Sequence, residues 1–153
     1  VKEVKKEKTN AMRMLDRAKV DYEFFTYDAS DGHIDGASVA RKMGQDPKQV
    51  YKTLVTKGHS GEHFVFVIPV EEELDLKKAA KAVGEKNVEM IAVADLLKTT
   101  GYIRGGCSPV VDSSPLALDK LSVRGGRIGL QILLSPADLQ KTVGAEFEQI
   151  THN

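Results

Sequence analysis

The middle of the chain predicts a β-hairpin, and this hairpin limits the folds that the chain can adopt. In residues 51–57, successive side chains would point to opposite faces, as is typical of a strand. Residues 62–70 contain the longest apolar run, which is far too short to cross a membrane. Two glycines lie in the short connection at 58–61, so we expect the two segments to pair as neighbouring strands.

Helix signals occur on both sides of the hairpin. Leu76, Ala79, Ala80 and Val83 recur at the spacing of one helix face and predict a helix over residues 75–83. Further short helices are predicted at residues 11–18, with Thr9 or Asn10 as cap, at 38–43, at 94–100, and at 136–143 behind the cap Ser135.

The remaining strand signals alternate irregularly with these helices. They lie at residues 22–27, 88–91, 110–111, 121–123, 128–134 and 146–150. Because the order is not a regular strand–helix–strand repeat, the sequence predicts an α+β fold. We expect a single domain over residues 1–153, with a mixed, mostly antiparallel β-sheet or a partly closed barrel flanked by short helices.

Composition places the chain among ordinary globular proteins, with 41% hydrophobic and 29% charged residues. Basic and acidic residues number 22 each, so any contact with nucleic acid must come from a local patch. The single cysteine predicts a reducing, cytoplasmic location. Residues 1–8 are highly charged and do not resemble a signal peptide.

Common catalytic and metal-binding motifs are absent from the sequence. It contains no GxxxxGK[ST], HExxH, GxSxG or CxxC pattern, and its four histidines lack metal-ligand spacing. We therefore expect neither a metal nor a cofactor.

Lys52 is the first candidate for chemistry. Alternation places it on one face of its strand with Leu54 and Thr56, and places Thr53 on the other. A lysine in such a position either protects an edge strand or presents a charge to a pocket. The spacing alone favours the edge-strand interpretation.

Residues 101–109 form the second candidate. Gly105 and Gly106 permit close approach of a ligand, and Ser108 before Pro109 must be extended, which exposes backbone N–H groups. Cys107 has no neighbouring base that would make it a nucleophile, so we expect it in a pocket wall.

Several segments, in matching order, resemble the YbaK family of Cys-tRNA(Pro) deacylases, which is related to the editing domain inserted in bacterial prolyl-tRNA synthetases. The combination of Tyr-Lys-Thr-Leu with Gly-Tyr-x-x-Gly-Gly-x-Ser-Pro is specific. The matching segments are residues 8–12, 46–54, 74–80, 88–90 and 101–109.

The resemblance implies a function and a set of site residues. The chain would hydrolyse the ester of Cys-tRNA(Pro), with the thiol of the substrate itself attacking the ester. Lys52 would be the required lysine, which reverses the preference for an edge-strand role. The substrate would be held by Tyr27, Thr53, Gly101, Gly105, Gly106, Cys107, Ser108 and Gln131.

The chain departs from the family pattern at several positions. Gln131 stands where many members have aspartate, and Arg124 replaces a common serine and favours phosphate contact. Val110 follows the Ser-Pro pair where a glycine and a basic loop are usual. Ile34 or Asp35 stands near the place of a common aromatic residue.

Two alternatives to Cys-tRNA(Pro) hydrolysis remain open. One is deacylation of Ala-tRNA(Pro), and the other is a non-catalytic module that binds tRNA or the synthetase. In each case the expected partner is tRNA, with prolyl-tRNA synthetase as a second partner, no membrane, and a monomeric or weakly dimeric chain.

Overall fold

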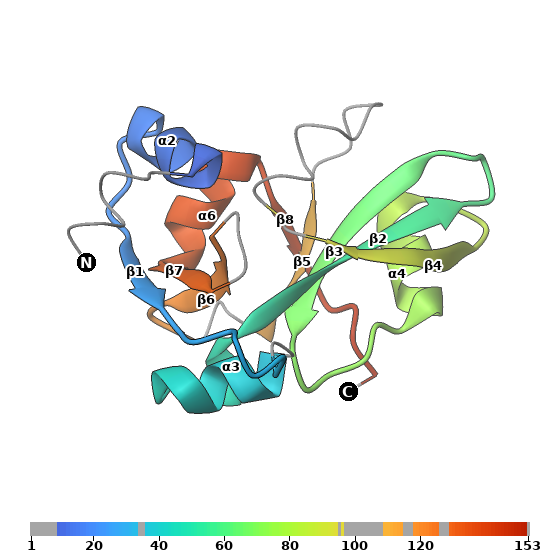
Figure 1. Cartoon of the computed structure of the whole chain (residues 1–153). Helices are drawn as coiled ribbons and strands as arrows, with labels where there is room; N and C mark the ends of the chain where they lie inside the picture. Colours follow the sequence, from blue (N-terminus) through green and yellow to red (C-terminus); the bar gives the residue numbers. More distant parts are fainter. Residues whose placement is uncertain are drawn as a thin grey trace.

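The computed structural model describes residues 9–33, 36–94, 96, 109–114, 118–125 and 129–152, and its strands form two sheets (Figure 1). The first sheet has three antiparallel strands in the order β1-β7-β6. These strands are β1 (Glu23–Thr26), β7 (Leu130–Leu134) and β6 (Leu121–Arg124).

The second sheet is mixed and has five strands in the order β4-β2-β3-β5-β8. Its centre is the predicted hairpin, in which β2 and β3 pair antiparallel over seven residue pairs. β4 adds antiparallel to β2, whereas β5 and β8 add in parallel beyond β3. The strands are β4 (Val88–Ala94), β2 (Tyr51–Gly58), β3 (His63–Pro69), β5 (Val110–Asp112) and β8 (Glu146–Glu148).

Short helices connect and cover these strands, and two of them begin directly after the predicted caps Thr9 and Ser135. Thr9, Asp75 and Ser135 each accept a hydrogen bond from a backbone amide in the first turn of the helix that follows. The helices are α2 (Asn10–Arg17), α3 (Gly36–Met43), the 3₁₀ turn η1 (Pro47–Gln49), α4 (Leu76–Val83) and α6 (Pro136–Val143).

Two hydrophobic clusters form the core, one on each face of β3. Val65 and Val67 belong to a cluster that also contains side chains of α2, α6, β6 and β7, so this cluster joins the two sheets. Phe66 and Ile68 face the other way and pack with Ala79 of α4. Because side chains alternate along a strand, one buried strand supplies both clusters.

The predicted α+β fold with a mixed sheet is confirmed, but the strands divide into two sheets rather than one. The sheets meet where Val50, just before β2, forms a parallel bridge with Ser122 of β6. No helix among the described residues is long and apolar enough to span a membrane.

Two local predictions are wrong. Leu76 was expected on the buried face of α4, yet it is 41% exposed, because the small Ala79 and Ala80 make the close contact with the sheet. Ala94 was expected to begin a helix, yet it ends β4, because it pairs with Thr53 of β2. Of the remainder of that predicted helix, only Leu96 lies within the described residues.

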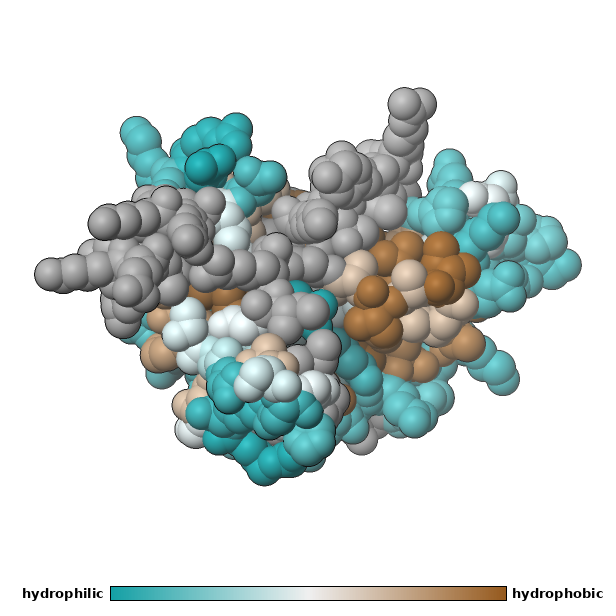
Figure 2. All heavy atoms as spheres, in the orientation of Figure 1, coloured by the Kyte–Doolittle hydropathy of each residue, from teal (hydrophilic) through white to brown (hydrophobic). Residues whose placement is uncertain are grey.

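β4 is an edge strand with unusually exposed apolar side chains. Met90, Ile91 and Val93 are 41%, 48% and 68% exposed. Figure 2 shows apolar surface over the region that β4 occupies in Figure 1. Val93 and the adjoining Ala94 also line the pocket described next.

Candidate active site

A small pocket lies where the two sheets meet. Its volume is about 160 Å³, which is the space of about five water molecules. Both sheets and α3 contribute to its walls. The lining residues are Tyr27, Val39, Val50, Tyr51, Lys52, Thr53, Val70, Val93, Ala94, Arg124 and Gln131.

Lys52 reaches this pocket from an interior strand. β2 lies between β4 and β3, so the edge-strand interpretation of Lys52 is wrong. The side chain is half-buried, and within the part of the chain that the structure describes it forms no hydrogen bond or ion pair. A partly buried ammonium without a counter-ion is costly, and an anionic or strongly dipolar ligand would offset that cost.

Tyr27 forms the wall opposite β2, directly after β1. Its backbone N–H donates to the Gly129 carbonyl at 2.9 Å. Gly129 has φ +92°, and a Cβ at this position would lie 3.3 Å from the Tyr27 carbonyl oxygen, so glycine suits this close approach. The Tyr27 hydroxyl is buried and has no hydrogen-bond partner among the described residues.

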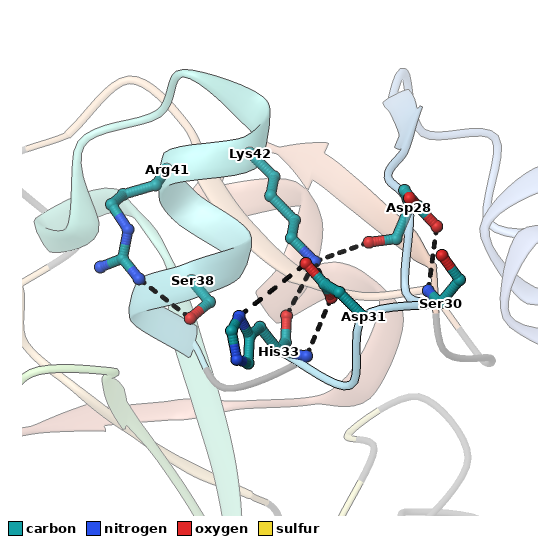
Figure 3. A network of polar contacts seen from close by, with 7 residues as sticks. All are labelled: Asp28, Ser30, Asp31, His33, Ser38, Arg41 and Lys42. Carbon is teal, nitrogen blue, oxygen red and sulfur yellow. Dashed lines mark hydrogen bonds and ion pairs between the residues drawn. The ribbon is translucent and has the colours of Figure 1, made fainter.

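The loop after Tyr27 is held against α3 by one lysine (Figure 3). Lys42 Nζ donates to the Asp28 carbonyl at 2.6 Å, to Asp31 Oδ1 at 2.7 Å and to the His33 carbonyl at 3.0 Å. The bond from Lys42 lowers the pKa of Asp31 below its ordinary value, with a further contribution from the backbone N–H of His33. The same ammonium lies 5.9 Å from the centroid of the Tyr27 ring. Lys42 therefore positions the Tyr27 wall.

β6 and β7 supply the remaining polar groups. Gln131 is 4% exposed, and its Nε2 donates to Ser122 Oγ at 3.0 Å, which fixes the side-chain amide. Arg124 is the cross-strand partner of Gln131 and is half-buried at the pocket wall. Tyr51 lies nearby, where burial raises its pKa to about 12 and its hydroxyl is bonded to Ser114 Oγ at 2.7 Å.

The pocket walls combine apolar and cationic side chains. Val39, Val50, Val70 and Val93 are the apolar ones. Lys52 and Arg124 provide two positive charges, and no aspartate or glutamate occurs among the described lining residues. Such a pocket suits a small ligand that carries both an apolar group and negative or developing negative charge.

The structure brings four of the predicted site residues together. Tyr27, Lys52, Thr53 and Gln131 line the same pocket although they come from two strands and a loop. The predictions for Gly101, Gly105, Gly106, Cys107 and Ser108 lie outside the described residues.

Sequence reasoning did not identify the valine wall. Val39 lies on α3, Val50 precedes β2 and Val70 follows β3, and a single valine beside an element end carries no recognisable signal. Among the described residues, no group of three or more His, Cys, Asp or Glu side chains is placed to hold a metal ion.

Comparison with known proteins identifies the family. The model of the aminoacyl-tRNA editing domain matches residues 35–142. The chain belongs to this family. A protein of Enterococcus faecalis, provisionally named Cys-tRNA(Pro)/Cys-tRNA(Cys) deacylase EbsC, is 41% identical over 154 residues, which cover 95% of this chain and 94% of the relative. The chain is thus an aminoacyl-tRNA editing enzyme, a deacylase whose substrate is an aminoacyl-tRNA.

Solved structures share the editing-domain fold. One, provisionally described as a trans-editing enzyme for prolyl-tRNA synthetase, superimposes with a TM-score of 0.69 at 20% identity, covering 95% of this chain and 99% of that chain. A hypothetical protein superimposes with a TM-score of 0.72 at 21% identity, covering 92% and 97%. At these identities the likeness concerns the fold.

Proposed function

We propose that this chain hydrolyses Cys-tRNA(Pro), and that the pocket between the two sheets receives the cysteinyl ester. The observation that carries this proposal is the convergence of Tyr27, Lys52, Thr53 and Gln131 on one small pocket. The name of the relative from Enterococcus faecalis, which includes both Cys-tRNA(Pro) and Cys-tRNA(Cys), supports the choice of amino acid. We also propose that residues 1–153 form one editing domain.

The size and walls of the pocket suit a small aminoacyl group. A volume of about 160 Å³ is well below that of pockets for drug-sized ligands. The valine side chains can contact the cysteine Cβ and sulfur, while Lys52 faces the ester. A large side chain would clash with these walls, so the pocket selects against bulky amino acids.

The reaction would use the substrate thiol as nucleophile. The thiol sulfur attacks the carbonyl carbon of its own ester, and the bond from that carbon to the ribose oxygen breaks. The thiol proton passes to the ribose oxygen, which releases tRNA with a free hydroxyl. The cyclic cysteine thiolactone that remains is opened by water to free cysteine. The described pocket residues include no carboxylate or histidine base, which suits a substrate that supplies its own nucleophile.

Lys52 would act electrostatically in this reaction. Its positive charge favours the thiolate form of the substrate and stabilises the oxyanion that forms on the carbonyl oxygen. Because Lys52 pairs with Ile68 of β3 and the adjoining Thr53 pairs with Ala94 of β4, the backbone that carries the charge is fixed before the substrate binds. Thr53 and Gln131 fix the surrounding walls.

Deacylation assays with Cys-tRNA(Pro) and Ala-tRNA(Pro) test the proposal. We expect Lys52→Ala to lower kcat/KM for Cys-tRNA(Pro) by about 10²- to 10³-fold, the typical loss when a group that stabilises an oxyanion is removed. Lys57→Ala is the matched control, because Lys57 lies on the same strand but is exposed. It should keep wild-type activity.

The outcomes separate the competing functions. Release of cysteine by wild type at the rate of buffer alone would contradict the proposal and leave a tRNA-binding module without turnover. Equal rates on the cysteinyl and alanyl substrates would contradict the role of the substrate thiol, because alanine has none and would require a bound water as nucleophile.

A further inference from the structure

We propose that Arg124 forms a phosphate subsite in the pocket, and that this subsite binds the 5′-phosphate of the 3′-terminal nucleotide of the tRNA. This inference rests on the proposed function, since it assigns the part of the substrate that lies next to the hydrolysed ester. It divides the two cations of the pocket between two tasks: Lys52 serves the ester, and Arg124 serves the nucleotide.

The position of Arg124 makes it available to a ligand. It is the last residue of β6, and its cross-strand partner is Gln131, whose amide is held by Ser122. Its side chain is half-buried at the pocket wall. Within the described residues it forms no ion pair or hydrogen bond, so none of the described carboxylates neutralises it.

The positive charge of the described lining residues exceeds what the ester requires. An aminoacyl ester is neutral, its reaction develops one negative charge, and its α-amino group is partly cationic near neutral pH. A second cation beside that ester would repel the α-amino group unless an anion also enters. The permanent anion of the substrate nearest the ester is the phosphate on the same nucleotide.

The chemistry of arginine fits this anion. A guanidinium presents two parallel N–H groups that match the oxygens of a phosphate, whereas lysine offers a single strongly hydrated charge. Lys52 and Arg124 line the same small pocket, so one bound ester that also carries the phosphate can reach both walls. Fixing the phosphate on the β6 wall would orient the ribose and bring the ester toward Lys52 on the β2 wall.

Two minimal substrates test the division of labour: 3′-O-cysteinyl adenosine with a 5′-phosphate and the same ester without it. We expect Arg124→Gln to lower kcat/KM about ten- to a hundredfold on the phosphorylated ester, mainly through KM, which corresponds to loss of a charge-assisted hydrogen bond. The same variant should have the wild-type kcat/KM on the ester without phosphate. On the phosphorylated ester, the kcat/KM of Arg124→Lys should lie between those of wild type and Arg124→Gln.

Two further variants serve as references. Lys52→Ala should lower the rate on both esters, and Arg17→Gln, at an exposed arginine of α2, should affect neither. A thermal unfolding curve for each variant shows whether it is folded. Equal losses on both esters for Arg124→Gln, or no loss on either, would overturn the phosphate subsite.

A measurement on full-length substrate covers the case in which the minimal esters are too weakly bound to react. The logarithm of KM for Cys-tRNA(Pro) should rise with the logarithm of salt concentration, and Arg124→Gln should reduce that slope by about 1. An unchanged slope would overturn the subsite. If wild type fails to deacylate Cys-tRNA(Pro) at all, the proposed function fails, and that result is distinct from either outcome for Arg124.

Discussion

At the scale of single residues, Tyr27 has an unusual environment. Its hydroxyl is buried without a hydrogen-bond partner among the described residues, while its backbone and ring are held by Gly129 and Lys42. A buried hydroxyl without a partner costs stability, so proteins rarely retain one without a reason. Substrate binding in the adjoining pocket is such a reason.

Tyr27→Phe should therefore separate stability from activity. We expect the free energy of unfolding to stay the same or to rise by about 1 kcal/mol, because an unsatisfied group is removed. The kcat/KM for deacylation should fall about three- to tenfold through the loss of a hydrogen bond to the substrate. Denaturant unfolding and deacylation assays measure the two quantities.

Tyr51→Phe is the matched control. The Tyr51 hydroxyl is bonded to Ser114 Oγ at 2.7 Å, so removing it should lower the free energy of unfolding by about 1 kcal/mol. If Tyr27→Phe destabilises the protein as much as Tyr51→Phe does, the Tyr27 hydroxyl has a structural partner and its assignment to the substrate is wrong.

The position of Lys52 could be predicted from the sequence only in part, because it depends on strand pairing. Alternation alone placed Lys52 on one face of its strand with Leu54, but it could not show that β2 has a strand on each side. That depends on β4, whose pairing with β2 is a long-range contact. The resemblance to a known family pointed to the pocket where spacing alone favoured an edge strand.

At the scale of elements, local sequence signals were sufficient to predict the bounds of an element whose ends are fixed by its own residues. α6 begins directly after the predicted cap Ser135, α4 begins one residue after its predicted start, and Gly84 and Gly144 end the two helices with positive φ. The strands were less well defined, because their ends depend on partners elsewhere in the chain. β4 extends to Ala94 since Thr53 pairs with it there.

The cap of α4 predicts a pH dependence. Asp75 Oδ1 accepts the backbone amides of Lys77 and Lys78 at 3.0 and 3.1 Å, and these bonds, with that of Lys78 first, lower the pKa of Asp75 from its ordinary value of 3.8. A carboxyl with a lowered pKa in the folded state contributes stability above its ordinary pKa, and this contribution is lost as pH falls through the folded value.

Asp75→Asn keeps an oxygen that can cap the helix but removes the charge. We expect wild type to be more stable than the variant between pH 5 and pH 6, and the difference to shrink as pH falls below 3.8. Urea unfolding at several pH values measures it. Asp75→Ala, which removes both cap and charge, should be less stable than wild type even at low pH, and a pH-independent gap for Asp75→Asn would contradict the argument.

At the scale of the whole molecule, long-range pairing decided what the sequence could not. The α+β fold followed from the irregular order of strand and helix signals. The division into two sheets did not, because it depends on which strands pair, such as β1 with β7, and no local pattern links these segments. The same division creates the pocket, so the pocket walls were equally hidden, apart from the residues that the family resemblance supplied.

The position of the core predicts which apolar residues matter for stability. Phe66 is fully buried between β3 and α4, whereas Val93 is 68% exposed on the edge strand β4. Phe66→Ala should lower the free energy of unfolding by about 3–5 kcal/mol, and Val93→Ala should change it by less than about 0.5 kcal/mol. Denaturant unfolding compares them, with Phe66→Leu as the milder change if Phe66→Ala does not fold. Similar losses at both positions would contradict this core.

The way in which the two sheets meet has a consequence for how accurately the pocket selects its substrate. Lys52 and Thr53 stand on one sheet and Arg124 and Gln131 on the other, so the width of the pocket depends on how the sheets are set against each other. That setting is maintained by the shared hydrophobic cluster beneath them, to which Tyr51 of the pocket also belongs, and by the bridge from Val50 to Ser122. A packing defect remote from the ester could therefore let larger amino acids enter while the protein still folds, and errors in substrate choice would precede loss of the native state.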